Sequence, residues 1–325
     1  MRILHLSDTH LGATRRVHGG PAGWERALDH RAAMEAALAH AVPGEIDLVV
    51  HTGDLFDRTS PESEDAWWAY ETLETLSKKI PVLVCAGSHA RRGLARHLPH
   101  RPGQLVVVDR DERVELAGLT LGVVAYARTA KAWAQRAARV CAEGVDLLVT
   151  HQPIDGAEVA GLTFRAGRRA DTVGVAHLPD AVRLVLCGYV HRRQVLQVGD
   201  AVAVCPGGTE RTAFSERFEQ KGFVIWERVE GRWSHRFVDI PTRPMVVVDR
   251  AEDVEQVAEG CLVSIEAEPW EALASACQER GALVVHRPLS RDQVRTLVED
   301  DQVALPLGAV AYLPTVRALR DDKKD

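Results

Sequence analysis

Five short segments of this chain combine the carboxylate and imidazole side chains that bind divalent metal ions. Each follows a short apolar run of the kind that forms a buried β-strand. The segments are Asp8-Thr9-His10, Gly53-Asp54-Leu55-Phe56-Asp57, Gly87-Ser88-His89, His151-Gln152-Pro153 and Gly188-Tyr189-Val190-His191. One such segment is typical of a turn or a cap, but turns do not explain five of them in succession. Open α/β sheets carry their sites at the carboxyl ends of strands, so we expect these side chains to lie together.

Mixed carboxylate and imidazole ligands suit Mn²⁺, Fe²⁺ or Zn²⁺. An aspartate that bridges two such ions would support in-line attack on a phosphorus centre. The ions would lower the pKa of a bound water and neutralise charge on the phosphoryl oxygens. The five segments therefore predict metal-assisted chemistry on a phosphoester.

The apolar runs and the patterns between them predict a layered α/β architecture. A helix is expected over Trp24 to Val42, from the spacing of its apolar positions. Strands are expected at Arg2 to Leu6, Asp47 to His51, Ile80 to Ala86, Asp146 to His151 and Arg183 to Gly188. Short alternating strands between Gln194 and Ile240 predict a second sheet packed as a sandwich.

Pro241 and Pro244 interrupt this pattern, and a smaller α/β unit follows them. Its expected elements are strands at Met245 to Val248, Leu262 to Ile265 and Leu283 to Val285, with a helix through Ala276. We therefore expect two domains, residues 1–240 and residues 241–325, the second ending in a C-terminal tail. The apolar positions of that tail could dock a partner or close the small domain.

The amino-acid composition argues against several other classes of protein. With 46% hydrophobic residues in 325, the chain can bury a large core, which argues against disorder. No stretch approaches ~20 apolar residues, so we expect a soluble cytoplasmic protein and no membrane partner. The six cysteines form no C-x-x-C pair and are expected to be buried, reduced thiols. A net charge of −6 argues against a chain that coats nucleic acid by its overall charge.

The order of the five segments resembles the pattern of calcineurin-like metallophosphoesterases: D-x-H, G-D-x-x-D, G-N-H-D, a lone H, then G-H-x-H. Two further stretches, Cys205 to Phe223 and Pro241 to Pro244, are similar to those of the SbcD-type DNA repair exonucleases. The resemblance covers about the first 245 residues well. It implies a four-layer metallophosphoesterase β-sandwich flanked by helices, with a small α/β capping domain. It also implies an SbcD-like exonuclease or endonuclease that processes DNA ends with an SbcC-type coiled-coil ATPase, as a homodimer.

Carried over position by position, the resemblance implies two metal sites that share Asp54. The first would be held by Asp8, His10, Asp54 and His191. The second would be held by Asp54, His151 and the positions of Ser88 and Tyr189, where the family has Asn and His. His89 would be the catalytic histidine, acting with Asp54, but Ala90 stands where the family has its acidic partner. An imidazole without that carboxylate loses a group that orients it, so catalysis should suffer.

The two altered ligands predict a weak or empty second site. Ser88 offers a short neutral hydroxyl, and Tyr189 offers a phenol with an ordinary pKa near ~10. Because disturbing even a group behind a ligand lowers metal affinity ~10 to 100-fold, two changed ligands should cost at least that each. A phenolate on a trivalent ion, or a substituting water, would be the route to rescue. We expect Mn²⁺, with Fe²⁺, Fe³⁺, Zn²⁺ and Mg²⁺ as alternatives, and about one tightly held ion per chain.

Arginine pairs follow four of the five segments and predict contacts to a phosphate backbone. The expected DNA-binding residues are Arg15, Arg16, Arg91, Arg92, Arg168, Arg169, Arg192 and Arg193. The alternative is an arginine-rich composition that scatters such pairs through exposed loops. Asp57 is either an acid beside the site or a cap of the following helix. Trp67 and Trp68 favour helix packing over base stacking.

Three functions compete on this evidence. An active metal-dependent hydrolase of DNA is favoured by the complete first site and by His89. A catalytically impaired subunit that binds DNA or docks an ATPase is favoured by Ser88, Tyr189 and Ala90. A phosphatase for a small substrate fits the motifs but not the added domain or the arginine pairs.

Overall fold

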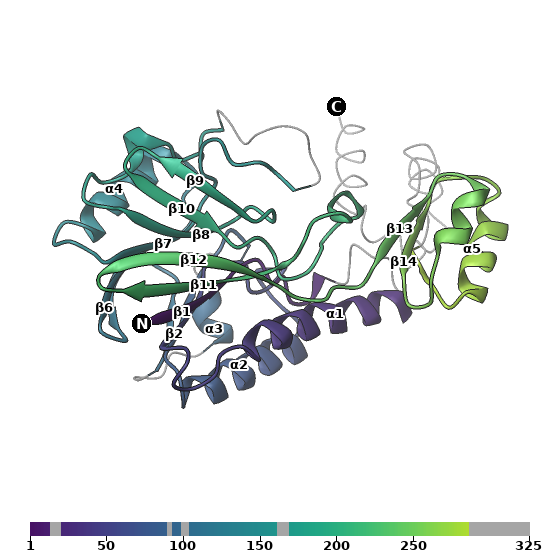
Figure 1. Cartoon of the computed structure of the whole chain (residues 1–325), viewed down its shortest axis with the longest axis horizontal. Coiled ribbons are helices and arrows are strands. Elements are labelled where there is room, and N and C mark those ends of the chain that lie inside the picture. Colours follow the sequence, from purple (N-terminus) through teal and green to yellow (C-terminus); the bar gives the residue numbers. More distant parts are fainter. Residues whose placement is uncertain (14–20, 90–92, 99–103, 161–168, 286–325) are drawn as a thin grey trace, which may run out of the picture. The chain divides into compact units, whose positions relative to one another are not determined.

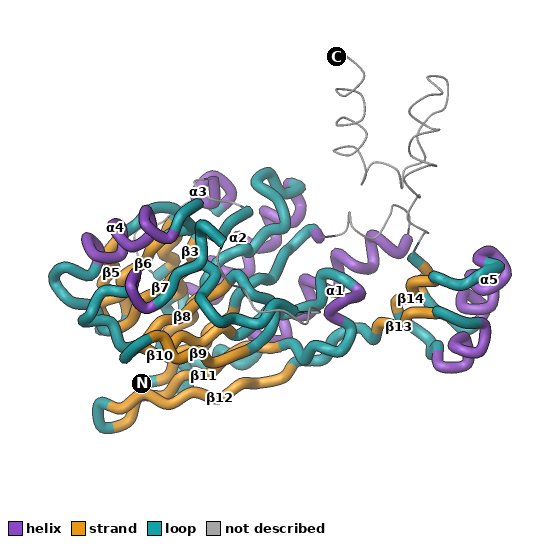
Figure 2. The backbone as a smooth tube through the Cα atoms, turned by 90° about the horizontal axis from the view of Figure 1, so that it is seen from above, coloured by secondary structure: helices purple, strands orange, loops and turns teal. Residues whose placement is uncertain are grey.

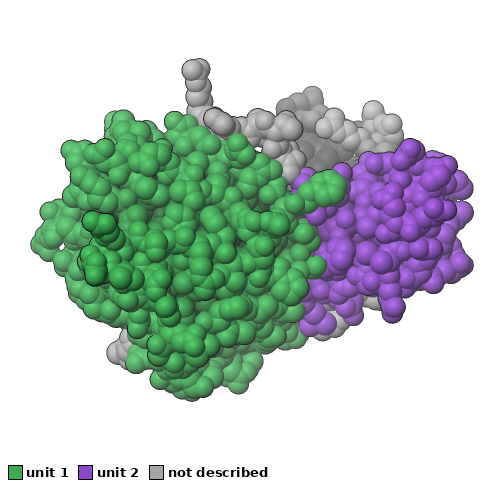
Figure 3. All heavy atoms as spheres, in the orientation of Figure 1, with its two compact units in different colours: residues 1–12, 30–211, 218–242 green, residues 13–29, 212–217, 243–325 purple. Residues whose placement is uncertain are grey.

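A computed structural model of the chain describes residues 1–13, 21–89, 93–98, 104–160 and 169–285. The chain divides into two compact units, which Figure 3 colours green and purple. The first unit contains residues 1–12, 30–211 and 218–242. The second contains residues 13–29, 212–217 and the chain from 243 onward. The expected domains 1–240 and 241–325 stay a prediction.

The first unit contains two six-stranded sheets. In the first sheet the order is β12-β11-β1-β2-β3-β4. Its strands are β1 (Arg2–Leu6), β2 (Leu48–His51), β3 (Val82–Cys85), β4 (Leu105–Val108), β11 (Gly222–Val229) and β12 (Arg232–Asp239). Strands β1 to β4 are parallel, whereas β11 pairs antiparallel with both β1 and β12. The four parallel strands therefore end at one edge.

In the second sheet the order is β5-β6-β7-β8-β10-β9. Its strands are β5 (Glu112–Leu116), β6 (Leu119–Val124), β7 (Leu147–His151), β8 (Leu184–Gly188), β9 (Gln194–Val198) and β10 (Ala201–Cys205). Strands β6, β7, β8 and β10 are parallel, and the hairpin partners β5 and β9 run antiparallel. Figure 1 shows β7, β8, β10 and β9 following one another across this sheet.

Three apolar clusters join four layers. The inner faces of the two sheets bury residues such as Val50 and Val149 against one another. The outer face of the first sheet packs against α1 (Pro21–Leu38), α2 (Ser63–Ser77) and α3 (Leu94–His97). The outer face of the second sheet packs against α4 (Ala130–Val140), which Figure 2 shows beside β6 and β7. Helices covering both outer faces of a sandwich confirm the expected fold class.

Helix α4 shows how local sequence and packing agree. The Thr129 hydroxyl accepts a hydrogen bond from the Ala132 backbone amide and caps the helix start. Trp133 is fully buried, and its indole N–H donates to Thr150 Oγ1 at 2.9 Å. The helix thus covers the second sheet without leaving this buried donor unpaired.

The predicted strands and the first helix are present, with one correction to their pairing. We expected all strands between Gln194 and Ile240 to form a second sheet. Strands β9 and β10 do join the second sheet, but β11 and β12 extend the first sheet beside β1. Alternating apolar residues indicate a strand with one buried face, but they do not select the strand beside it.

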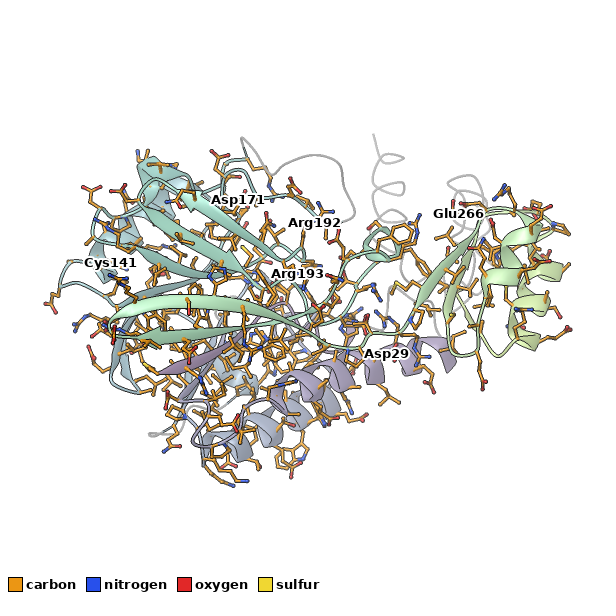
Figure 4. All side chains as sticks on the ribbon, viewed as in Figure 1. Asp29, Cys141, Asp171, Arg192, Arg193 and Glu266 are labelled. Carbon is orange, nitrogen blue, oxygen red and sulfur yellow. The ribbon has the colours of Figure 1, made fainter. Side chains whose placement is uncertain are left out.

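The second unit contains a three-stranded parallel sheet and a helix. Its elements are β13 (Met245–Val248), β14 (Leu262–Ile265), β15 (Leu283–Val284), α5 (Trp270–Glu279) and the 3₁₀ helix η5 (Ala251–Gln256). Within this unit Arg243 donates to both carboxylate oxygens of Asp29, at 2.7 and 2.8 Å, and to the carbonyl of Gly260. Asp29 is labelled in Figure 4. The arginine of the Pro241 to Pro244 stretch therefore ties this unit together.

Two further sequence expectations can be compared with the fold. All six cysteines are buried and unpaired. Trp68 packs partly against the core, as expected, whereas Trp67 is 64% exposed. Within the described part of the chain, no helix combines the length and apolar character needed to span a membrane.

Candidate metal centre

The five predicted segments follow strands whose carboxyl ends share sheet edges. Strands β1, β2 and β3 lead to the first three segments, and β7 and β8 lead to the last two. Four of the side chains stand on backbone with positive φ: Asp8 at 51°, His10 at 46°, Asp54 at 50° and Tyr189 at 95°. Non-glycine residues rarely adopt this conformation, and such strain clusters at functional sites.

A first cluster joins Asp8, His10 and His191. Their ligating atoms lie within 4.8 Å of one another. The Nε2 atoms of the two histidines are 3.1 Å apart, and each lies 3.9 Å from Asp8 Oδ1. Asp8 and His10 are almost fully buried, at 1% and 3% exposure. Three of the four residues implied for the first ion are thus close enough to share it.

A second cluster joins Asp8, Asp54 and His151, again within 4.8 Å. His151 Nε2 lies 3.0 Å from Asp54 Oδ2 and 3.9 Å from Asp8 Oδ1. In this geometry Asp8 is the carboxylate common to both clusters. The bridging role that the resemblance gives to Asp54 stays a prediction.

The hydrogen bonds of His151 define its chemistry. The Thr52 carbonyl can only accept, so Nδ1 carries a proton and donates to it at 3.0 Å. A neutral ring would then point the Nε2 lone pair at the Asp54 carboxylate. Burial opposes a charged ring, but Asp54 and Asp8 outweigh it and raise the pKa of His151 to about 9. Nε2 therefore requires a proton or a metal ion.

The first cluster also contains atoms that the protein alone does not satisfy. Asp8 Oδ1 is buried without a hydrogen-bond partner among the described residues. Beside it, two imidazole nitrogens face each other at 3.1 Å, a contact that two lone pairs cannot make. A cation bound between these atoms would satisfy all three, and carboxylate with imidazole suits Mn²⁺, Fe²⁺ or Zn²⁺. The residues therefore fit a divalent metal.

The two altered positions make contacts of a different kind. Ser88 Oγ donates to Asp54 Oδ2 at 2.9 Å. The Tyr189 backbone amide donates to Asp8 Oδ2 at 3.1 Å. Its ring stacks parallel to Tyr126 at 6.0 Å, with the ring of His151 edge-on at 5.6 Å. Burial raises the pKa of the Tyr189 phenol although Arg169 opposes the shift, which weighs against a phenolate ligand.

His89 is held by backbone groups. Its Nδ1 donates to the Asp57 carbonyl at 2.5 Å, and its amide donates to Asp54 Oδ1 at 2.8 Å. Nε2 then lies 3.9 Å from Asp54 Oδ2, on a side chain that is 32% exposed. A carbonyl therefore orients this ring. Ala90 lies outside the described residues.

Asp57 belongs to this group of side chains. One of its carboxylate oxygens, Oδ1, lies 3.4 Å from His10 Nδ1, and Asp57, His10 and His89 form a third cluster within 4.8 Å. The alternative that Asp57 caps the following helix is wrong, because α2 begins at Ser63 after Glu62.

Two buried histidines behind the site were missed by the sequence analysis. Thr9 Oγ1 donates to the Leu55 carbonyl, so the 3.1 Å contact to His51 is donated by His51 Nε2. The Gly53 amide donates to His51 Nδ1, which makes the ring a neutral tautomer. Burial is the main cause that lowers the pKa of His51 to about 4 and of His5 to about 3. His5 and His51 lie within apolar runs that predict strands. Those runs gave no sign that the two histidines are buried behind the site.

Glycines allow the loops that carry the candidate ligands to approach one another closely. A Cβ on Gly87 would lie 2.2 Å from the Asp54 amide nitrogen. A Cβ on Gly53, whose φ is +120°, would lie 2.3 Å from His151 Nδ1. Any side chain at these positions would displace the ligands. The G-D and G-S-H patterns in the sequence are the signal for this contact.

Three predicted DNA-binding arginines can be placed, and acids contact all of them. Arg192 pairs with Glu219 at 2.6 Å and with Glu158 at 2.9 Å. Arg193 pairs with Asp239, and Arg169 pairs with Asp171. Figure 4 labels Arg192 and Arg193, which lie between β8 and β9. The other five, Arg15, Arg16, Arg91, Arg92 and Arg168, lie outside the described residues. Their DNA contacts stay a prediction.

Known proteins are similar to much of this sequence. The chain is 28% identical over 274 residues to the DNA double-strand break repair protein Mre11 of Methanosarcina mazei, covering 79% of this chain and 41% of that protein. It is 26% identical over 276 residues to the SbcD component of the nuclease SbcCD of Bacillus subtilis, covering 71% and 67% of the two chains. The same component from Staphylococcus epidermidis is 22% identical over 286 residues, covering 79% and 74%.

The chain spans about half the length of three Mre11 relatives, with shares of 41%, 43% and 54%. A family profile also matches most of the sequence. The profile of the calcineurin-like phosphoesterase superfamily domain matches residues 1–228, which include all five segments and both sheets except β12 and the last residue of β11. This chain belongs to the calcineurin-like phosphoesterase superfamily.

Proposed function

We propose that this chain is a metal-dependent phosphodiesterase that cleaves DNA, the nuclease component of a complex that processes DNA ends. The observation that supports it most is the convergence of Asp8, His10, Asp54, His151 and His191 on two adjoining clusters whose geometry fits a metal ion. The names of the relatives, a break repair protein and a nuclease component, favour DNA as the phosphodiester.

The protein residues would divide the work. Asp8, His10 and His191, with Asp54, would hold one Mn²⁺ tightly, whereas Ser88 and Tyr189 leave the second site weak. A bound metal ion lowers the pKa of a water ligand and offsets phosphoryl charge. His89, oriented by the Asp57 carbonyl, presents its partly exposed Nε2 to a phosphate or to a leaving oxygen.

Two further proposals concern partners. An SbcC-type coiled-coil ATPase would supply the second component, in keeping with the name of the SbcCD relatives. Two copies of this chain would form the homodimer. Arg169, Arg192 and Arg193 would contact the DNA backbone only by exchanging their acidic partners for phosphates.

The deciding experiment is cleavage of labelled double-stranded and single-stranded DNA by the purified chain with Mn²⁺. We expect degradation that Asp54→Ala abolishes and that Asp200→Asn, a change of an exposed acid in the β9–β10 turn, leaves intact. Equal cleavage by the Asp54→Ala protein would assign the activity to a contaminant and contradict the proposal.

A second candidate is a protein that keeps the fold but has lost catalysis. The observations that favour it are Ser88 hydrogen-bonded to Asp54, and a Tyr189 ring that stacks on Tyr126 with the His151 ring edge-on to it. It predicts DNA binding without cleavage, and recovery of cleavage when Ser88→Asn and Tyr189→His are combined. Cleavage by the unaltered chain would remove this candidate.

A further inference from the structure

A cavity of about 1070 Å³ opens in the first unit beside the metal centre. Its walls are the loop after β4, the loop after β6 and the exposed side of helix α4. A volume of this size holds a ligand larger than a single phosphate group.

Sheet order places this cavity next to the metal-binding loops. Strand β4 is the parallel neighbour of β3, which leads to Ser88 and His89. Strand β6 is the parallel neighbour of β7, which ends at His151. The cavity therefore lies one strand outward from the centre on both sheets, at the same carboxyl edge.

Tyr126 connects the two places directly. It lines the cavity, and its ring stacks on Tyr189 with only 4° between the ring planes. Tyr189 in turn contacts Asp8 and His151. The Tyr126 hydroxyl donates to Asp171 at 2.9 Å, which holds the ring in place. A strand bound at the metal centre would have this cavity within reach.

The cavity carries more positive than negative charge. Arg110, Arg128, Arg136 and Arg139 line it with two carboxylates, Asp109 and Asp111. Asp111 contacts two arginines at once, with Oδ2 at 3.6 Å from Arg136 and 3.3 Å from Arg139, while its Oδ1 accepts from the Ala125 amide. One carboxylate thus positions two guanidinium groups without neutralising both.

The other two arginines are exposed to solvent. Arg110 is 85% exposed and lies 3.6 Å from Asp109 Oδ1. Arg128 is exposed, and within the described residues its side chain has no hydrogen bond or ion pair. Guanidinium groups recognise phosphate oxygens with paired donors, and these contacts carry no base specificity.

We propose that this cavity binds phosphate groups of a nucleotide chain, as a subsite for DNA beside the metal centre. This rests on the proposed function for the identity of the substrate. Two ligands could supply such phosphate groups: a DNA strand with its consecutive phosphates, or a free nucleotide released by cleavage. We favour the strand, because the arginines come from three separate segments and line a volume larger than one phosphate fills.

The test measures binding without cleavage. The purified chain in EDTA is titrated into a short fluorescent single-stranded oligonucleotide at several salt concentrations. We expect the double variant Arg110→Gln/Arg128→Gln to bind roughly 10-fold more weakly and to lower the slope of log Kd against log salt by about 1.4, since each lost phosphate contact on a single strand removes about 0.7. Thermal melting confirms that the variant is folded.

Two controls sharpen the result. The matched double variant Arg232→Gln/Arg236→Gln alters exposed arginines on β12, the strand at the opposite edge of the first sheet from β4, and should keep the slope. Arg128→Lys keeps the charge and should keep most of the slope. An unchanged slope in the Arg110 and Arg128 variant, or equal losses in both double variants, would overturn the proposal.

A competition arm separates the two sources. If dTMP does not displace the oligonucleotide, the strand is the ligand. If dTMP displaces it and binds more weakly to the double variant, the phosphate site stands with a free nucleotide as its ligand. Absence of oligonucleotide binding by the unaltered chain would overturn the subsite. Because the assay contains no metal, binding can be found even when cleavage, and with it the proposed function, fails.

Discussion

The metal centre has two halves. The same kind of sequence motif predicts both halves, but they carry different side chains. In the first half, Asp8, His10 and His191 turn three ligating atoms toward one point. In the second half, Asp54 and His151 do so, but Ser88 uses its hydroxyl to bind Asp54 and Tyr189 contributes an aromatic stack. Strands lead to both halves alike, since β3 and β8 end shortly before Ser88 and Tyr189. The two halves therefore differ in their side chains and not in the kind of strand that carries them.

The largest effect should come from changing one histidine in each half. His191→Gln removes an imidazole from the first cluster, so we expect the tightly bound ion to be lost, with affinity at least ~100-fold weaker. His151→Gln should weaken the same ion less, because His151 belongs to the other cluster. Calorimetric titration of metal-free protein with Mn²⁺ measures both.

Equal losses of affinity in the two variants would break the distinction between the halves. Circular dichroism of both proteins serves as the control, since His151 is fully buried and its replacement can also disturb the core.

Restoring the two altered ligands should allow the second half to hold a metal ion of its own. Combining Ser88→Asn and Tyr189→His supplies an amide oxygen and an imidazole. We expect the bound metal to rise from about one ion per chain toward two, measured by elemental analysis after dialysis against Mn²⁺. Two ions in the unaltered chain would contradict this account at once.

Acid should destabilise the layer behind the clusters. The pKa of His51 is about 4 and that of His5 about 3 in the folded chain, whereas an unfolded histidine has a pKa near ~6.5. Between these values the unfolded state binds more protons, so the free energy of unfolding should fall as pH decreases from about 6.5. Each histidine contributes up to roughly a tenfold change in the unfolding equilibrium per pH unit.

Denaturant unfolding of metal-free protein over this pH range measures the loss. His151 has the opposite effect on the pH dependence of stability. Its raised pKa of about 9 adds stability that is present below about pH 6.5 and is lost as the pH rises through 9. Constant stability from pH 6.5 to 5 would argue that the buried histidines are not neutral.

The smallest effect concerns the aromatic stack of the second half. Tyr126→Phe keeps the ring beside Tyr189 but removes the hydrogen bond to Asp171. Because Arg169 still contacts Asp171, we expect a loss of only about 1 kcal/mol in the free energy of unfolding. Urea unfolding tests this, with Tyr70→Phe on α2 as the matched control.

The convergence of the candidate ligands could be expected because each lies at the end of a strand or shortly after it, and parallel strands bring their carboxyl ends to one edge. His89 and Asp57 show the limit of that reasoning. The sequence showed that Ala90 replaces an acid, but not that the Asp57 carbonyl orients the His89 ring. Every residue has a backbone carbonyl, so a sequence motif cannot show which carbonyl orients the ring.

The arginines show a second limit. Pairs after the motifs predicted a basic surface, yet Arg192 and Arg193 contact acids that lie 27 to 46 positions away along the chain. The cavity arginines, Arg110 and Arg128, follow strands that carry no motif. Charge counts along a chain omit such long-range partners.

The sequence by itself determined the strands that lead to the five segments, the covering helix after the first strand, the ligand types and the two departures at Ser88 and Tyr189, because apolar periodicity and side-chain chemistry are local properties. The tertiary structure decided the pairing of β11 with β1, the position of Asp8 in both clusters and the cavity at the sheet edge. Those depend on which strands become neighbours, and that follows from the burial of whole faces against one another.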